Sequence, residues 1–250
     1  MSKVLITAGG SGLGRAMATA FHDAGHEVWA TDISESGLEN VPWQTTRADS
    51  SSETDNQNLF NEIQSVWGGI DVVCANAGIA GPTAGVENVS LNDWRECVSV
   101  NLEGAFLTAK YATPLMKQQK SGAMIFTSST AGIFGYPNRA PYAAAKWGII
   151  GLMKTIAMEL GPFGVRANVI APGAVEGPRM EGVLAREAAA KGMTRDQVYK
   201  GYAAGTSMRT FVTAQDVAAM ALFLGSDAAA RVSGQVIAVD GHTENPDPKP

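Results

Sequence analysis

The chain has 250 residues, of which 45% are hydrophobic and 17% are charged, and its formal net charge is −5 at pH 7. This length fits one large α/β domain or two small ones. The acidic balance argues against nucleic acid and anionic membranes as partners, and no apolar run reaches the roughly 18 residues of a membrane span. The N-terminus shows no signal-peptide pattern and Cys74 and Cys97 lack a metal-binding spacing, so we expect a cytoplasmic protein without a metal or a disulfide.

Short apolar segments alternate with helix-like segments along the whole chain. The apolar segments predict strands at Lys3–Ala8, Glu27–Thr31, Gln44–Ala48, Ile70–Ala75, Ala123–Ser128, Arg166–Ala171 and Gln235–Asp240. Amphipathic patterns predict helices over 13–24, 55–67, 91–118, 142–160 and 215–225. Most of these strands are apolar without alternation, which is typical of parallel strands that are covered on both faces. The sequence therefore predicts a doubly wound, mostly parallel, seven-stranded sheet with helices on both faces.

One segment interrupts this alternation after the sixth predicted strand. Residues 177–213 contain no strand pattern, and Gly182–Lys191 and Thr194–Tyr202 are predicted to be short helices. An insertion of this length at the carboxyl end of a strand is usually functional, and open α/β sheets bind ligands at that edge. We therefore expect a single domain over 1–241 with a helical substrate loop at about 177–213, followed by a loose C-terminal tail over 242–250.

A glycine-rich turn follows the first predicted strand. The sequence TAGGSGLG, Thr7–Gly14, lies between a strand and a helix, where glycines allow a backbone to approach a pyrophosphate and the helix N-terminus favours its negative charge. The second predicted strand is followed by Asp32, whose carboxylate can accept hydrogen bonds from ribose hydroxyls and repel a 2′-phosphate. This combination predicts NAD rather than NADP as the cofactor.

Four polar residues suggest acid–base chemistry at the same edge of the sheet. Tyr142 and Lys146 stand at i and i+4 of a predicted helix and so share one face. Ser129 follows the fifth strand, and Asn101 lies in the helical segment VSVNLEGAF. A nearby ammonium favours the phenolate form of a tyrosine, which makes it a usable base. Taken one at a time, each residue has an ordinary structural explanation: packing, a solvated surface charge, a turn cap or a satisfied core amide.

Taken together, these motifs are much more specific. TAGGSGLG, ANAG (75–78), VNLEGAF, SSTAG, PYAAAK, APG (171–173) and VDG (239–241) occur in an order and spacing that resembles the short-chain dehydrogenase/reductase family from Lys3 to about Gly241. The resemblance implies a Rossmann fold with Tyr142 as general acid/base, Lys146 as its pKa partner and ribose ligand, Ser129 as the residue that orients the substrate, and Asn101 as the water-holding member of a proton relay. It also implies a homotetramer.

The resemblance further implies where the cofactor binds. The cofactor-binding residues that it implies are Ser11, Gly12, Leu13, Asp32, Asp49, Ser50, Asn76, Ala77, Gly78, Tyr142, Lys146 and Val175.

Four positions depart from the family pattern. Ala8 replaces the first glycine of the turn, where a side chain disfavours positive φ, and Ala75 replaces an asparagine. Gly177 stands where many members carry a threonine that contacts the nicotinamide side. His242 replaces a glycine after the last motif and could reach a neighbouring subunit or simply lie on the surface.

The substrate is less constrained than the reaction. Arg179 could bind a carboxylate, sulfonate or phosphate, or it could pair with Glu176 or Glu181 on the surface. We interpret Arg139 as structural. A further group of residues could shape the pocket or belong to the core or an interface: Ile133, Phe134, Tyr136, Trp147 and Met180.

The leading interpretation is an NAD-dependent dehydrogenase acting on a secondary alcohol, a sugar or polyol, or a hydroxy acid, with Tyr142 as the base. A carbonyl or 3-oxoacyl reductase is the alternative within the family, and Asp32 speaks against it because biosynthetic reductases usually use NADPH. A non-catalytic NAD-binding sensor is a minor alternative, since a sensor need not retain a proton relay.

Overall fold

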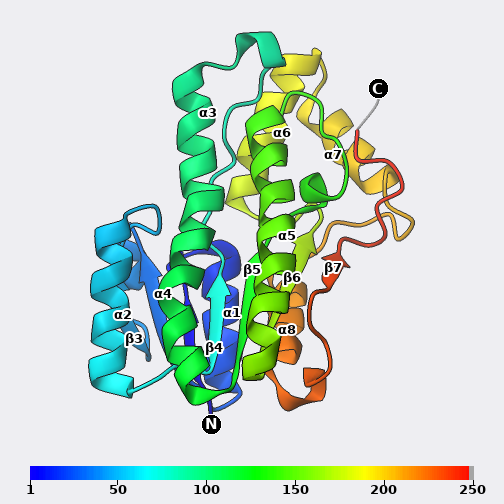
Figure 1. The fold of residues 1–250 in the computed structure, drawn as a ribbon. Helices are drawn as coiled ribbons and strands as arrows, with labels where there is room; N and C mark the ends of the chain where they lie inside the picture. The colour runs from blue at the N-terminus through cyan, green and yellow to red at the C-terminus, as the bar shows by residue number, and fades with distance from the viewer. Residues whose placement is uncertain (248–250) are drawn as a thin grey trace.

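The computed structural model describes residues 1–247. Within them, seven strands form one sheet in the order β3-β2-β1-β4-β5-β6-β7, and all neighbouring strands are parallel (Figure 1). The strands are β1 (Lys3–Ile6), β2 (Glu27–Asp32), β3 (Gln44–Arg47), β4 (Val72–Ala75), β5 (Gly122–Thr127), β6 (Val165–Pro172) and β7 (Val236–Val239). The predicted doubly wound sheet is therefore confirmed, and it is parallel throughout.

Helices cover both faces of this sheet. They are α1 (Gly12–Asp23), α2 (Glu53–Trp67), α3 (Leu91–Val98), α4 (Gly104–Gln119), α5 (Ala140–Leu160), α6 (Pro178–Lys191), α7 (Arg195–Ala204) and α8 (Ala214–Gly225). The helix predicted over 91–118 is not one regular helix, because a π-helical turn, Ser99–Glu103, lies between α3 and α4. Such turns add a residue to the helical repeat and are frequent at functional sites.

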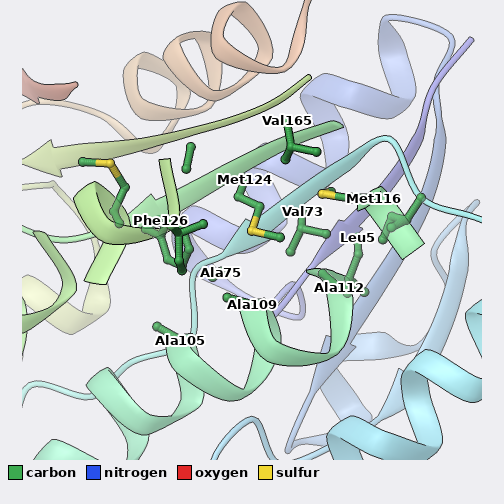
Figure 2. Packing of buried hydrophobic residues seen from close by; sticks show 14 of the residues in the cluster. Leu5, Val73, Ala75, Ala105, Ala109, Ala112, Met116, Met124, Phe126 and Val165 are labelled. Atoms are coloured by element: carbon green, nitrogen blue, oxygen red, sulfur yellow. The ribbon is translucent and has the colours of Figure 1, made fainter. Parts of the chain in front are cut away.

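The core has two layers, one on each face. Side chains of α2, α4 and α5 pack on one face with Leu5, Val73 and Phe126, whereas α1 and α8 pack on the other. In Figure 2 the small side chains of Ala105 and Ala109 lie on the side of α4 that faces the sheet. Because alanine projects little from the helix, α4 approaches β4 and β5 closely, and this positions the π-helical turn at the carboxyl edge of the sheet.

The chain reverses its winding direction between β1 and β4, which are neighbours in the sheet. Ligands of open α/β sheets bind at such a switch point, outside the carboxyl ends of the strands. Here Thr7 joins the two strand ends, because its hydroxyl accepts hydrogen bonds from the backbone N–H of Asn76 (3.0 Å) and of Ala77 (3.1 Å). These hydrogen bonds hold the segment after β4 against the end of β1.

The segment after β6 forms a small helical layer above this edge, near the top of Figure 1. The two short helices predicted there are present as α6 and α7, and they share a separate apolar cluster that includes Leu184, Val198 and Phe211. A parallel bridge between Val175 and Val212 joins the ends of the segment.

Residues 242–247 are not the loose tail that the sequence suggested. The backbone N–H groups of Glu244 and Asn245 both donate to the carbonyl of Gly205, and the carboxylate of Asp247 pairs with Lys191 of α6 at 2.7 Å. Residues 248–250 of the predicted tail lie outside the described residues. Among residues 1–247, no helix is long and apolar enough to cross a membrane.

Candidate active site

The glycine-rich turn places the start of α1 at the switch point. Ala8 adopts φ 51° and Gly12 adopts φ 50°, so the turn needs the left-handed region at both positions. An alanine there costs roughly 1–2 kcal/mol relative to a right-handed conformation, and the chain adopts the left-handed turn in spite of the side chain. A Cβ on Gly14 would lie only 2.0 Å from the carbonyl oxygen of Ala8, so only glycine allows α1 to begin this close to the turn.

Asp32 lies at the carboxyl end of β2, beside this turn. Its carboxylate accepts hydrogen bonds from the backbone N–H of Gly10 (3.1 Å) and of Ser34 (3.0 Å), and the side chain is half-buried. These two bonds fix the carboxylate at the cleft without neutralising it. Asp49 and Ser50 follow β3 on the same edge, one strand further out.

The residues predicted for catalysis meet at the carboxyl end of β5. Tyr142 and Lys146 lie in the first turns of α5, and the Lys146 ammonium is 5.6 Å from the centroid of the Tyr142 ring. Lys146 is buried, and its Nζ donates to the carbonyl oxygen of Thr127 at 2.9 Å. Ser129 follows β5 directly. The i, i+4 spacing therefore does place the phenol and the ammonium on one face.

The surroundings of Tyr142 favour its charged form. Burial by itself raises the pKa of Tyr142, but the positive charges of Lys146, Arg179 and Arg139 oppose it. A hydrogen bond from Ser129 acts in the same direction, and the net result is that the pKa of Tyr142 lies below its ordinary value. Burial lowers the pKa of Lys146 to about 8, while the Tyr142 phenolate acts to raise it. At neutral pH the ammonium thus stays charged next to the phenol.

Asn101 is fully buried in the π-helical turn. Its amide nitrogen donates to the carbonyl oxygens of Cys97 (2.8 Å) and Ile79 (3.1 Å), whereas its Oδ1 has no partner within the described chain. A Cβ placed on Gly78 would lie 2.5 Å from this oxygen and 3.2 Å from the Lys146 Nζ, so both atoms face the same small space. A buried carbonyl oxygen of this kind is suited to hold a water.

Two arginines flank the phenol, and the structure corrects the sequence interpretation of each. Arg139 lines the pocket instead of serving only as a structural residue, and its Cζ lies 4.7 Å from the centroid of the Tyr142 ring. Arg179 does not pair with Glu176 or Glu181. Its Nη1 donates to the carbonyl oxygen of Gly78 at 3.1 Å, and Glu181 instead pairs with Arg195.

A cavity of about 370 Å³ lies at the carboxyl edge of the sheet; Tyr142, Lys146, Arg139 and Arg179 line it, whereas Asn101 does not. Of the predicted cofactor residues, those that line it are Ser11, Gly12, Leu13, Asn76, Gly78, Tyr142, Lys146 and Val175. Asp32, Asp49, Ser50 and Ala77 do not line this cavity, although the first three lie along the same sheet edge. Ser129 also lines it.

Several residues that line the cavity could not be predicted from sequence patterns. Tyr136 and Met180 line it, as one of the two sequence interpretations allowed, whereas Ile133, Phe134 and Trp147 do not. Additional lining residues are Thr130, Arg139, Val183 and Tyr202. The sequence contains no signal that Arg139 lines the cavity, because an arginine just before a helix is usually exposed.

The remaining departures have local explanations. Gly177 has φ 136°, a conformation that side chains rarely adopt, so the threonine of other members would be strained at this position. The imidazole of His242 lies 3.0 Å from the hydroxyl of Ser207, which joins the C-terminal segment to the helical layer.

Comparisons with known proteins show which family the chain resembles. A family model described as enoyl-(acyl carrier protein) reductase matches residues 7–242. Levodione reductase of Leifsonia aquatica is 34% identical over 95% of this chain and 92% of its own length, and a crystal structure of a levodione reductase superposes with a TM-score of 0.91. The 3-oxoacyl-[acyl-carrier-protein] reductase FabG of Thermotoga maritima is 33% identical over 95% of both chains. An NAD⁺-bound xylitol dehydrogenase superposes with a TM-score of 0.93 at 25% identity, over 96% of this chain and 98% of that one.

Proposed function

This chain belongs to the short-chain dehydrogenase/reductase family of oxidoreductases, and from that premise we propose that it transfers hydride between a hydroxyl-bearing carbon and NAD, with Tyr142 as the general base. The observation that carries the proposal is that Tyr142, Lys146 and Ser129 line one cavity on the switch-point edge of the sheet, with the Asn101 Oδ1 buried behind them beside the Lys146 ammonium. Family members catalyse oxidoreduction at CH–OH groups, and the four side chains provide the acid–base chemistry for it.

The proposed mechanism assigns each side chain a separate task. Ser129 holds the substrate oxygen beside Tyr142, and the phenolate of Tyr142 removes the hydroxyl proton. Lys146 stabilises that phenolate, and the Oδ1 of Asn101 holds a water that links the ammonium to solvent. When bound, oxidised NAD supplies the hydride acceptor. In the reverse direction the protonated Tyr142 donates its proton to a carbonyl oxygen.

The residues along the cleft fit a dinucleotide. The left-handed turn at Ala8 and Gly12 directs the N-terminus of α1 toward the cavity, which suits a pyrophosphate, and the half-buried carboxylate of Asp32 suits ribose hydroxyls. Asp49 and Ser50 are placed further out for the adenine. NAD is preferred over NADP in this proposal because a phosphate beside Asp32 would be repelled.

The cofactor assignment is tested by Asp32→Ala. We expect the ratio of kcat/KM with NAD to kcat/KM with NADP to fall by roughly 10- to 100-fold, the usual size of lost charge-assisted hydrogen bonds. Arg47 lies opposite Asp32 in the register of β2 and β3, so a cationic residue remains on the neighbouring strand when the carboxylate is removed. Initial rates with both cofactors provide the measurement.

Asp32→Asn serves as the matched variant, because it keeps the size of the side chain and removes only its charge. This variant should lower the preference for NAD over NADP, because a carboxylate no longer repels the 2′-phosphate. Its amide should still make part of the hydrogen bonding to the ribose. A wild-type enzyme that already prefers NADP would show that the cofactor assignment is wrong.

The reaction itself is tested by following NADH formation at near-ultraviolet wavelengths with a panel of secondary alcohols, polyols, sugars and hydroxy acids. We expect turnover with at least one class and none without NAD. If no alcohol is oxidised although NADH binds, the reverse assay with ketones and 3-oxoacyl thioesters follows. Turnover there alone would support the reductase alternative, for which the similarity to FabG provides the reason.

We also propose that the protein functions in the cytoplasm as a homotetramer, with residues 1–241 forming one catalytic domain. Large apolar side chains remain exposed on α4 and α5, including Phe106, Trp147 and Met158. They support burial against other subunits. The two buried thiols, Cys74 and Cys97, are unpaired, which is compatible with a reducing compartment.

A further inference from the structure

A buried positive charge lies beside the catalytic phenol. Arg139 is only 6% exposed, yet it lines the cavity next to Tyr142. Its Nη2 donates to the carbonyl oxygen of Ala80 at 3.0 Å, and its Nε has no hydrogen-bond partner among residues 1–247. A buried donor without a partner is costly, and a buried guanidinium is normally paired with an anion. Arg139 therefore has the properties of a residue whose partner is a ligand.

A second guanidinium lines the same cavity. Arg179, at the start of α6, donates to the carbonyl oxygen of Gly78, two residues before the carbonyl that holds Arg139. The two arginines thus reach the same loop, one from α5 and one from the helical layer. Both act on the pKa of Tyr142, so both are close enough to the phenol for their charges to be felt there.

Among residues 1–247, no carboxylate forms a direct ion pair with either arginine. Within the described part of the chain, neither arginine forms an ion pair within 4.0 Å, because Glu181 pairs with Arg195 and the Glu176 carboxylate contacts the hydroxyl of Tyr199. Glu187 is buried with one oxygen unpaired, but it interacts with Tyr202 and does not line the cavity. Glu176 also lines the cavity, but the three cationic side chains of Lys146, Arg139 and Arg179 still give it an excess of positive charge.

We infer that the substrate carries an anionic oxygen group, a carboxylate or a sulfonate, which binds between Arg139 and Arg179 while its hydroxyl carbon faces Tyr142. A planar guanidinium can bind such a group with two hydrogen bonds, and the unpaired Nε of Arg139 supplies one donor. Because the Arg139 Cζ lies 4.7 Å from the Tyr142 ring centroid, the anionic group and the reacting hydroxyl belong to one compact molecule. The inference rests on the proposed dehydrogenase function and names its substrate class.

Binding is measured without turnover, on the full-length enzyme saturated with NADH. The probes are cyclohexanecarboxylate, cyclohexanesulfonate and the neutral cyclohexanecarboxamide, titrated by calorimetry. We expect at least one anion to bind tenfold or more tightly than the amide, and the two anions distinguish a planar from a tetrahedral group. Equal affinity for the amide and both anions would overturn the inference.

Arg139→Gln should abolish the preference for an anion over the amide. The affinity for the anion should fall about 10- to 100-fold, whereas the affinity for the amide should change little. Arg179→Gln, at an exposed position that does not endanger folding, should reduce it by a smaller factor. Arg186→Gln removes the same charge from an exposed site on α6 that does not line the cavity, and should leave it unchanged. An equal loss in all three variants would show a general field effect and contradict the inference.

This design separates the two proposals. Anion binding that depends on Arg139, combined with no turnover of any alcohol or ketone, would retain the anion site and refute the proposed function. Turnover of neutral alcohols, with no preference for anions, would retain the function and refute the anion site.

Discussion

Replacing Tyr142 by phenylalanine should lower kcat for alcohol oxidation by about 10³-fold, within the range expected for loss of a positioned general base. The substitution removes only the phenolic oxygen, so the ring can still stack below the Arg139 guanidinium and the start of α5 need not move. NADH binding, followed by its fluorescence, should persist. Initial rates of NADH formation with the best substrate of the panel provide the measurement.

Tyr136→Phe is the informative comparison. Tyr136 lines the same cavity and its hydroxyl lies 3.0 Å from that of Thr130, but burial raises its pKa to about 12, so it cannot act as a base near neutral pH. We expect a loss of no more than about tenfold, the cost of one hydrogen bond. Unchanged activity in Tyr142→Phe, or an equal loss in both variants, would refute the assignment of the base.

Replacing Lys146 by methionine should lower kcat/KM at neutral pH by about 100-fold or more. Methionine has nearly the same length, so the buried space is filled while the ammonium and its hydrogen bond to Thr127 are lost. The phenol then loses the charge that opposes the effect of burial most strongly, and its pKa rises. The variant should therefore be inactive mainly because Tyr142 remains protonated.

The pH profile shows whether this explanation is correct. Oxidation needs the phenolate, so its rate is high above the pKa of Tyr142 and falls as pH drops through that value. In the wild type the pKa of Tyr142 is lowered, which places this fall below the ordinary range of a tyrosine. In Lys146→Met the fall should move to higher pH, and activity should partly recover in alkaline buffer.

Lys154→Met is the control for the loss of a lysine from α5. Lys154 lies two helical turns further along α5 and is exposed, with its Nζ bonded to the carbonyl oxygen of Gly234. Its replacement should change neither the rate nor the profile. If the Lys146→Met variant has the same pH profile as the wild type, whatever its activity, the proposed effect of the ammonium on Tyr142 is contradicted.

The sequence alone determined the architecture of the protein. Parallel strands that are buried on both faces must be apolar along their whole length, so their number and order of appearance were visible as apolar segments between helical patterns. The glycine-rich turn and the i, i+4 spacing of Tyr142 and Lys146 were equally visible, because these features act over a few residues. The family resemblance turned Ser129 and Asn101 from single candidates into members of one predicted catalytic group.

Other features depend on segments that are far apart in the sequence, and only the tertiary structure decided them. Arg139 lies against the ring of Tyr142 and donates to the carbonyl oxygen of Ala80, which follows a different strand. The burial of Arg139 and its unpaired Nε could therefore not be predicted from the sequence. The same holds for the C-terminal segment, whose polar sequence suggested a loose tail but which binds to Gly205 and Lys191. Local patterns report the backbone conformation that a segment prefers, whereas burial and charge pairing depend on which other segments the fold brings beside it.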